Sequence, residues 1–401
     1  MIASAVELYK NAYSGLSRRI WLLGVVMLIN RSGTMVLAFM TLYCTQLGYS
    51  IKQAGWVVAV YGLGSVCGSL AGGRISDRIG FYYTQVFSLF FGGLLFMLLG
   101  QMRTYESICI CTFFLSMVNE SFRPANATAI AHYSTLQNRT QSFSLVRLAI
   151  NIGWGVGSAL GGLLASIDYH LLFWVDGFTN VAAACMLLII LPKVSVSEQR
   201  TPIVTHQSEA SIKTPYKDRT FLYFWLFTFL FSICFFQMFT TVPIYFKDNL
   251  KMNEATIGII MAANGLFIAL FEMVFVFKLE GKVPYLRLMF YGTLLMALSF
   301  LLLNIPLVAG VVLASAFILV ITVAEIVAMP FMNSYYIART TDKNRGQYAG
   351  LYTMAWSAAQ VIGSSAGAFF AFRYGFSSLW FLVSLMSVTA AFGYFWLLKK
   401  S

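Results

Sequence analysis

The sequence predicts an all-α integral membrane protein with twelve transmembrane helices in two pseudo-symmetric six-helix halves. Three observations lead to this fold class: the chain carries little charge, its apolar runs have the length of membrane spans, and its motifs recur at constant offsets. Of the 401 residues, 59% are apolar and only 10% are charged, and the mean hydropathy is +0.75. Soluble domains carry about 25% charged residues. So few charges cannot cover a water-facing surface, and the chain must face lipid.

The apolar runs define twelve spans, since a helix needs about 20 apolar residues to cross the hydrocarbon. In the first half we expect Ile20–Cys44, Gln53–Ile75, Phe81–Gln101, Ser107–Ala131, Ser142–Ser166 and Leu171–Leu191. In the second half we expect Phe221–Phe246, Ala255–Phe277, Leu286–Leu303, Leu307–Asn333, Gly346–Phe372 and Ser377–Leu398. The one long connection, Pro192–Thr220, is rich in Pro, Ser and Thr and is typical of a linker. It divides the chain into an N-terminal half (1–191), a cytoplasmic linker (192–219) and a C-terminal half (220–401).

The two halves repeat each other in sequence. Asn138-Arg139 recurs as Asn344-Arg345, at an offset of 206 residues. The same offset relates further pairs, which are Pro124 and Pro330, Gly157 and Gly363, Gly161 and Gly367, and Trp174 and Trp380. An offset of 203 relates Gly55 to Gly258, Gly62 to Gly265 and Asp77 to Glu280. This pattern predicts a duplicated six-helix unit with parallel halves.

The distribution of basic residues predicts the orientation. With the N-terminus inside, the predicted inner segments hold nineteen Lys and Arg residues. The predicted outer segments hold five, which are Lys52, Arg103, Lys247, Lys251 and Arg373. Because basic residues concentrate on the cytoplasmic side, we expect both termini in the cytoplasm. The location predicted is the bacterial cytoplasmic (inner) membrane.

Several classes of function are excluded at this point. The net charge of +12 comes from short loops between spans rather than from one basic face, so nucleic-acid binding is not expected. The six cysteines and three histidines form no metal-binding cluster, and no nucleotide-binding loop is present. We therefore expect no enzyme activity, no cofactor and no metal. The expected partners are a small-molecule substrate, protons and membrane lipid, and we expect a monomer.

A gate motif lies between the second and third spans. Gly73, Asp77, Arg78 and Gly80 resemble the signature G-x-x-x-D-R-x-G of the major facilitator superfamily, a resemblance that extends over essentially the whole chain. It implies the major facilitator fold, with a cytoplasmic gate at this motif. Gly73 allows close helix approach, and Asp77 can pair with a cation or cap a helix N-terminus. The alternative is that these are ordinary loop charges.

The fifth predicted span carries a second motif. Gly153, Gly157, Ser158, Gly161 and Gly162 resemble the antiporter signature G-x-x-x-G-P-x-x-G-G of drug–proton exchangers. Ser158 stands where that signature has proline, which weakens the resemblance. The alternative is close helix packing through small residues, as in any membrane bundle.

Ionisable residues within the spans are the candidates for proton coupling and substrate binding, because a charge in the bilayer is costly unless it has a partner or faces water. They are Arg31, Glu120, Arg123, Glu272 and Glu325. Glu120 and Arg123 are three residues apart on one helical face and can form a pair. By resemblance, the first, fourth, seventh and tenth spans line a central cavity, which would hold all of these except Glu272. A structural pair or helix packing is the alternative for each.

Three functions remain open. The leading prediction, from resemblance to bacterial drug–proton antiporters, is proton-coupled export of small amphipathic compounds by alternating access, as in multidrug efflux. The alternative is a proton-coupled symporter for uptake of a small polar solute such as a peptide, sugar or organic acid. Arg31 and the Glu120–Arg123 pair favour this alternative, because they suit a polar substrate. A non-transporting membrane sensor or scaffold is the third possibility.

Overall fold

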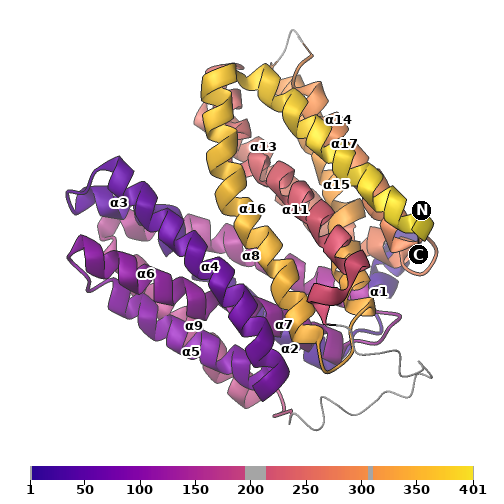
Figure 1. Ribbon diagram of the computed structural model, residues 1–401, viewed down its shortest axis with the longest axis horizontal. Coiled ribbons are helices and arrows are strands. Elements are labelled where there is room, and N and C mark those ends of the chain that lie inside the picture. The colour runs from indigo at the N-terminus through magenta and orange to yellow at the C-terminus, as the bar shows by residue number, and fades with distance from the viewer. Residues whose placement is uncertain (1, 195–213, 306–309, 401) are drawn as a thin grey trace. The chain divides into compact units, whose positions relative to one another are not determined.

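The computed structural model describes residues 2–194, 214–305 and 310–400, and within these ranges every regular element is a helix (Figure 1). Most of the predicted linker Pro192–Thr220 and the start of the predicted span Leu307–Asn333 lie outside the described residues. Ten described helical segments are long and apolar enough to cross a membrane. The protein is an integral membrane protein with the fold that the sequence predicts.

The first six predicted spans correspond to eight helices. These are α2 (Arg18–Ser32), α3 (Val36–Gln46), α4 (Ile51–Ile79), α5 (Phe81–Leu99), α6 (Tyr105–Glu120), α7 (Phe122–Tyr133), α8 (Arg139–Ile167) and α9 (His170–Ile190). The last six correspond to α11 (Arg219–Thr240), α12 (Val242–Asp248), α13 (Glu254–Leu279), α14 (Tyr285–Leu302), α15 (Gly310–Ala338), α16 (Arg345–Tyr374) and α17 (Phe376–Lys400). A short N-terminal helix, α1 (Ile2–Tyr13), and a 3₁₀ turn, Pro215–Lys217, complete the described elements.

Three of the predicted spans are broken in the middle. The fourth span divides into α6 and α7 at Ser121, because Pro124 has no N–H to donate to the carbonyl of Glu120. The seventh divides into α11 and α12 at Thr241, next to Pro243 in the first turn of α12. The first divides into α2 and α3 between Ser32 and Val36. The sequence predicted continuous helices here, and the breaks are a difference from that prediction.

Helix starts follow the expected capping chemistry. The Ser50 hydroxyl accepts from the backbone N–H of Gln53, and the Gln53 side chain accepts from the backbone N–H of Ser50. Helix α4 therefore begins with a capping box. The Asn253 side chain accepts from the backbone N–H of Thr256 at the start of α13. At the junction of α4 and α5, Gly80 has φ of +95°, a backbone conformation that other residues rarely adopt.

The described chain forms two compact units. Unit 1 comprises Met1–Gly15, Tyr216–Ala338 and Ala355–Ser401, and unit 2 comprises Leu16–Pro215 and Arg339–Met354. Helix α1 therefore belongs with the helices of the second sequence half, and the first turns of α16 belong with those of the first half. The assignment of residues 1–191 and 220–401 to two separate halves stays a prediction.

The sequence repeat is visible in local geometry. The backbone N–H of Thr135 donates to Asn138 Oδ1 at 2.8 Å, and that of Thr341, 206 residues later, donates to Asn344 Oδ1 at 2.8 Å. Each turn leads directly into a long helix, α8 or α16.

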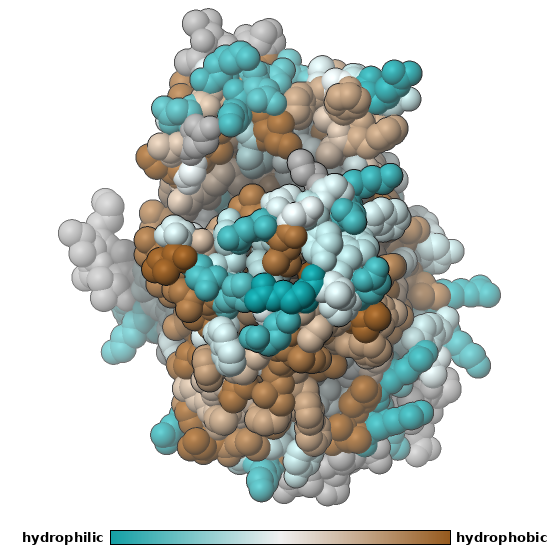
Figure 2. Space-filling model, turned by 90° about the vertical axis from the view of Figure 1, so that its left-hand side faces the viewer, coloured by the Kyte–Doolittle hydropathy of each residue, from teal (hydrophilic) through white to brown (hydrophobic). Residues whose placement is uncertain are grey.

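Apolar residues cover wide areas of the face seen in Figure 2, with hydrophilic residues gathered in patches between them. Such a surface suits a protein surrounded by lipid.

Candidate functional site

Four side chains of unit 2 form a charged group within the membrane span, here called the Glu120 cluster: Arg31, Tyr61, Glu120 and Arg123. Arg123 Nη1 lies 3.2 Å from Glu120 Oε2, so the predicted pair is formed. The Tyr61 hydroxyl donates to Glu120 Oε1 at 3.5 Å. Glu120 is buried, with 7% of its surface exposed. The pair holds α7 to the end of α6 across the break at Ser121.

Arg31 completes this cluster from α2. Its guanidinium interacts electrostatically with Glu120, Arg123 and Tyr61. Its Nε is buried and has no hydrogen-bond partner among the described residues. The Glu120 cluster thus contains two guanidinium groups and one carboxyl group, and Arg123 is the one that forms an ion pair with Glu120. A cluster of this kind can accept an anionic group or respond strongly to protonation of Glu120.

A second carboxyl group, in unit 1, forms the Glu325 cluster with Asn264 and Thr322. Asn264 Nδ2 donates to Glu325 Oε1 at 2.9 Å and to Thr322 Oγ1 at 2.9 Å, linking α13 to α15. Glu325 is only 2% exposed. Asn264 follows Tyr61 by 203 residues and Glu325 follows Glu120 by 205, close to the repeat offsets. The two halves thus hold a buried carboxyl against a polar side chain in corresponding places.

The break in the first span is closed by Asp176 of α9. Its carboxylate accepts from the backbone N–H groups of Met35 (3.0 and 3.1 Å) and Val36 (2.8 Å), which begin α3. A carboxylate at a helix N-terminus is stabilised by the free N–H groups and the helix dipole. Nearby, Asn30 donates to Asn180 at 2.9 Å. Asp176 therefore holds α3 in place directly after Arg31, a role that no local sequence pattern indicated.

The glycines of the fifth-span motif place α8 against this break. A Cβ at Gly153 would lie 2.7 Å from Arg31 Cβ, and a Cβ at Gly157 would lie 3.0 Å from the Ser32 carbonyl oxygen. A Cβ at Gly161 would lie 2.9 Å from the Phe39 ring. Ser158 is exposed, and a Cβ at Gly162 would meet no atom within 4 Å. Gly153 and Gly157 therefore fix the distance between α8 and α2, the helix that carries Arg31, and Gly161 does the same for α3.

The gate motif of α4 contacts the first turn of α16 within unit 2. Asp77 Oδ1 accepts the backbone N–H of Gly346 at 2.6 Å, and Asp77 Oδ2 accepts that of Gln347 at 2.9 Å. A Cβ at Gly73 would overlap the Gly346 carbonyl oxygen, so the two helices meet glycine to glycine. Asp77 thus caps a helix N-terminus, one of its two predicted roles. Arg78 is exposed.

Glu272 lies on α13, about two turns after Asn264, and is 3% exposed. Helix α1 lies along this helix, where the Tyr9 hydroxyl donates to the Leu270 carbonyl. Burial raises the pKa of the Tyr13 phenol, and the neighbouring Tyr9 and Glu272 raise it further. Glu272 therefore faces the N-terminal helix, which the sequence did not predict.

Aromatic side chains of α11 and α16 form a further group within unit 1. The Trp356 ring lies 5.6 Å from that of Phe235 and 6.1 Å from those of Phe231 and Phe236, centroid to centroid. Directly after Phe236 on α11, Gln237 Nε2 donates to the Gly363 carbonyl at 2.8 Å. Gln237 and Gly363 are each 206 residues after Arg31 and Gly157. The second half thus has an uncharged amide where the first half has Arg31.

Comparisons with known proteins agree with this architecture. The sequence profile described as Major Facilitator Superfamily matches residues 20–339. A Na(+), Li(+), K(+)/H(+) antiporter of Planococcus maritimus is 23% identical over 404 aligned positions, covering 92% of this chain and 93% of that protein. A class D tetracycline resistance protein of Salmonella ordonez is 24% identical, covering 79% of each chain. A bacterial homologue of the iron transporter ferroportin, in an outward-facing state, superposes with a TM-score of 0.75 at 16% identity, covering 96% of this chain and 100% of that one.

Proposed function

Because the chain belongs to the major facilitator superfamily, and is therefore a secondary transporter and not an enzyme, we propose that it exports small amphipathic compounds in exchange for protons. The observation that carries this proposal is the pair of carboxyl groups Glu120 and Glu325, which are close to repeat-related positions, each buried and each held by a polar side chain of a neighbouring helix. Buried carboxyl groups in membrane spans are typical of proton relays.

The proton step would occur at Glu120. While Arg123 contacts the carboxylate, its charge balances that of Glu120. If the Arg123 contact is lost as the helices rock, the buried Glu120 carboxylate loses its ion-pair partner, which favours uptake of a proton. The break at Ser121 lies between the two residues, so a change in the angle between α6 and α7 alters their distance. Proton binding would thus follow helix movement, as alternating access requires.

Two of the relatives support export. One is named as a cation–proton antiporter and the other as a tetracycline resistance protein, so exchange and drug resistance are found among proteins similar to this one. We propose further that the protein is a monomer in the bacterial inner membrane with both termini in the cytoplasm, from the distribution of Lys and Arg.

Uptake symport of a small polar solute is the second candidate. The Glu120 cluster favours it, because it contains two guanidinium groups, Arg31 and Arg123, that could bind a substrate carboxylate. An anion that draws Arg123 away from Glu120 would favour protonation of Glu120, so anion and proton would move together.

The test is substrate-induced proton movement in proteoliposomes with a pH-sensitive dye inside. Cationic dyes, peptides, sugars and organic acids would each be added outside at equal internal and external pH. Export predicts that amphipathic compounds entering the vesicles drive protons out. Co-movement of protons with a peptide, sugar or acid would support symport instead, and proton movement with none of them would contradict both.

A further inference from the structure

The last turn of α17 carries two exposed lysines that lie against aromatic rings of the same helix. Lys399 Nζ is 4.8 Å from the centroid of the Phe395 ring, and Lys400 Nζ is 3.9 Å from that of Trp396. An aromatic face attracts a cation, and the C-terminal end of a helix dipole does the same. Both ammonium groups are therefore stabilised close to the helix end.

Helix α14 brings a third cation to this place, because it lies antiparallel to α17 (Figure 1). Hydrogen bonds and a ring contact fix the register, and the contacting pairs are Asn304 with Ser377, Ala297 with Ser384, and Phe290 with Phe395. Arg287 lies one turn before Phe290, and Lys399 lies one turn after Phe395. Because residues one turn apart share a helical face, Arg287 and Lys399 lie at the same level where the two helices meet.

Helix α11 adds a fourth cation on a neighbouring face of α17. The contacting pairs are Tyr223 with Trp396 and Cys234 with Val383, so these two helices are also antiparallel. Arg219 lies one turn before Tyr223, and Lys400 lies one turn after Trp396. Three helices thus bring four cations around one helix end, here called the α17 basic edge: Arg219, Arg287, Lys399 and Lys400.

The α17 basic edge has no acidic counterpart within the described ranges. Its four side chains are exposed, and none of them forms an ion pair with a described residue. The first turns of α11 and α14 contain no acidic residue. Asp218, directly before Arg219, is buried and caps α11 through the backbone N–H of Phe221. Pro284 gives α14 no side-chain cap, so the positive end of that helix dipole adds to the charge.

Apolar surface lies directly beside these charges. The Phe290 ring is 5.9 Å from that of Phe392 and 5.2 Å from that of Tyr291. Phe392 is 56% exposed and Tyr291 is 53% exposed, and both belong to predicted membrane spans. A ligand of the α17 basic edge therefore has positive charge at one end and a lipid-facing aromatic surface next to it. This combination suits a molecule with an anionic head and acyl chains.

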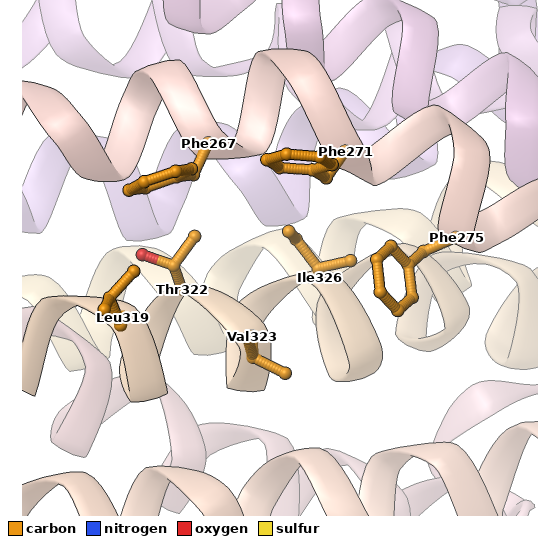
Figure 3. Close-up of a pocket in the computed structure, with 7 residues that line it drawn as sticks. All are labelled: Phe267, Phe271, Phe275, Leu319, Thr322, Val323 and Ile326. Atoms are coloured by element: carbon orange, nitrogen blue, oxygen red, sulfur yellow. The ribbon is translucent and has the colours of Figure 1, made fainter. Parts of the chain in front are cut away.

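The groove between α13 and α15, also in unit 1, is exposed but lacks such charges (Figure 3). One wall consists of Phe267, Phe271 and Phe275, and the residues of the other wall are apolar except Thr322. The Thr322 hydroxyl already donates to the Ile318 carbonyl. An acyl chain fits such walls, but they cannot distinguish one lipid headgroup from another. Selection by headgroup charge is therefore expected at the α17 basic edge and not in this groove.

We propose that the α17 basic edge binds the phosphate of an anionic membrane lipid, with Arg287 and Lys399 as its main ligands and the acyl chains along Phe392 and Tyr291. A phosphate diester accepts charge-assisted hydrogen bonds from guanidinium and ammonium groups, and basic pockets between helix ends bind anionic lipids. Phosphatidylcholine carries its own cation, which the basic edge repels, so phosphatidylglycerol is the preferred ligand. This site does not depend on the proposed export.

The experiment titrates the purified, delipidated protein in detergent with phosphatidylglycerol or with phosphatidylcholine of the same acyl chains, and native mass spectrometry counts the bound lipid. The double variant Arg287→Gln, Lys399→Gln should weaken phosphatidylglycerol binding about 30-fold, which is about fivefold for each basic residue at a lipid surface. Its affinity for phosphatidylcholine should change by less than about twofold. The matched control, Lys52→Gln with Arg373→Gln, removes the same charge from exposed positions on α4 and α16 and should change neither.

Lys399→Arg keeps the charge and should keep the affinity for phosphatidylglycerol. Thermal unfolding in lipid-free detergent should be the same for all variants, because the replaced side chains are exposed, so lost binding is separated from lost folding. Equal phosphatidylglycerol affinity of wild type and the Arg287→Gln, Lys399→Gln variant would overturn the proposal. Equal weakening by the control pair would also overturn it, because overall charge would then explain the preference. Glycerol phosphate that binds as tightly as the lipid would replace the lipid by a soluble anion.

Discussion

Asp77→Asn should break the contact between α4 and α16 in a measurable fraction of molecules. The Asp77 carboxylate accepts two backbone N–H groups, at 2.6 Å from Gly346 and 2.9 Å from Gln347. Asparagine has one carbonyl oxygen, so it can keep one of these bonds, and it has no charge to interact with the N-terminus of α16.

The size of the effect follows from these two losses. A hydrogen bond to a charged group contributes about 1.5–3 kcal/mol. Asp77 is partly exposed, which favours the lower part of this range. We therefore expect a loss of about 2 kcal/mol, equivalent to a rise of about 30-fold in the ratio of open to closed molecules.

Double electron–electron resonance would measure this ratio. Spin labels at Ile79→Cys on α4 and Lys343→Cys before α16 occupy exposed positions on the two sides of the contact. The background must lack the six natural cysteines. Asp342→Asn is the matched control, since Asp342 pairs with Arg345 at 2.6 Å beside the same helix end. It should leave the distances unchanged.

Gly346→Ala provides an independent perturbation, because the added Cβ would overlap the Gly73 carbonyl oxygen and lie 2.7 Å from Asp77 Oδ1. It should separate the helices at least as strongly as Asp77→Asn. If neither substitution alters the label distances, Asp77 is an ordinary loop charge and the gate assignment is refuted.

Three further predictions concern the first span, the glycine motif and the topology. Asp176→Ala should lower the free energy of unfolding by about 3 kcal/mol in a thermal-unfolding assay, because it leaves the N–H groups of Met35 and Val36 unpaired in a buried site; the same change at the exposed Asp248, at the end of α12, should be nearly neutral. Gly153→Ala should reduce transport by displacing Arg31, whereas Gly155→Ala, with no atom within 4 Å of its Cβ, should not; equal loss in both would show that helix flexibility, not the contact, matters. A membrane-impermeant thiol reagent should not label Ser208→Cys in intact cells; strong labelling would place the linker outside.

The positions of the spans could be predicted from the sequence, because hydrophobic length and charge are local properties. The ion pair between Glu120 and Arg123 could also be predicted from the sequence, because residues three positions apart on a helix lie on the same face. The breaks at Ser121 and Thr241 lie next to Pro124 and Pro243, whereas the length of the apolar runs alone predicts continuous spans.

Other parts of the site depend on residues far apart in the chain. Asp176 caps α3 about 140 residues earlier, and a lone acidic residue in a span gives no indication of which N-terminus it will meet. The Asn264–Glu325 hydrogen bond joins two residues that are 61 positions apart in the chain. Tyr61 and Asn264 are 203 residues apart, so the repeat relates the Tyr61–Glu120 contact to the Asn264–Glu325 contact. This relation becomes apparent only once α4 and α6 are known to be neighbours. Helix α1 is too short and polar to be recognised as a span.

The most direct test of proton coupling is Glu120→Gln in proteoliposomes, with substrate accumulation driven by a pH gradient and substrate counterflow measured on the same preparation. Glu106→Gln, at an exposed position of the same helix, is the matched control. We predict that Glu120→Gln abolishes gradient-driven accumulation and retains counterflow, because the neutral amide can bind Arg123 but cannot carry a proton. Full gradient-driven accumulation by Glu120→Gln would contradict the assignment of Glu120 and leave Glu325 as the coupling residue.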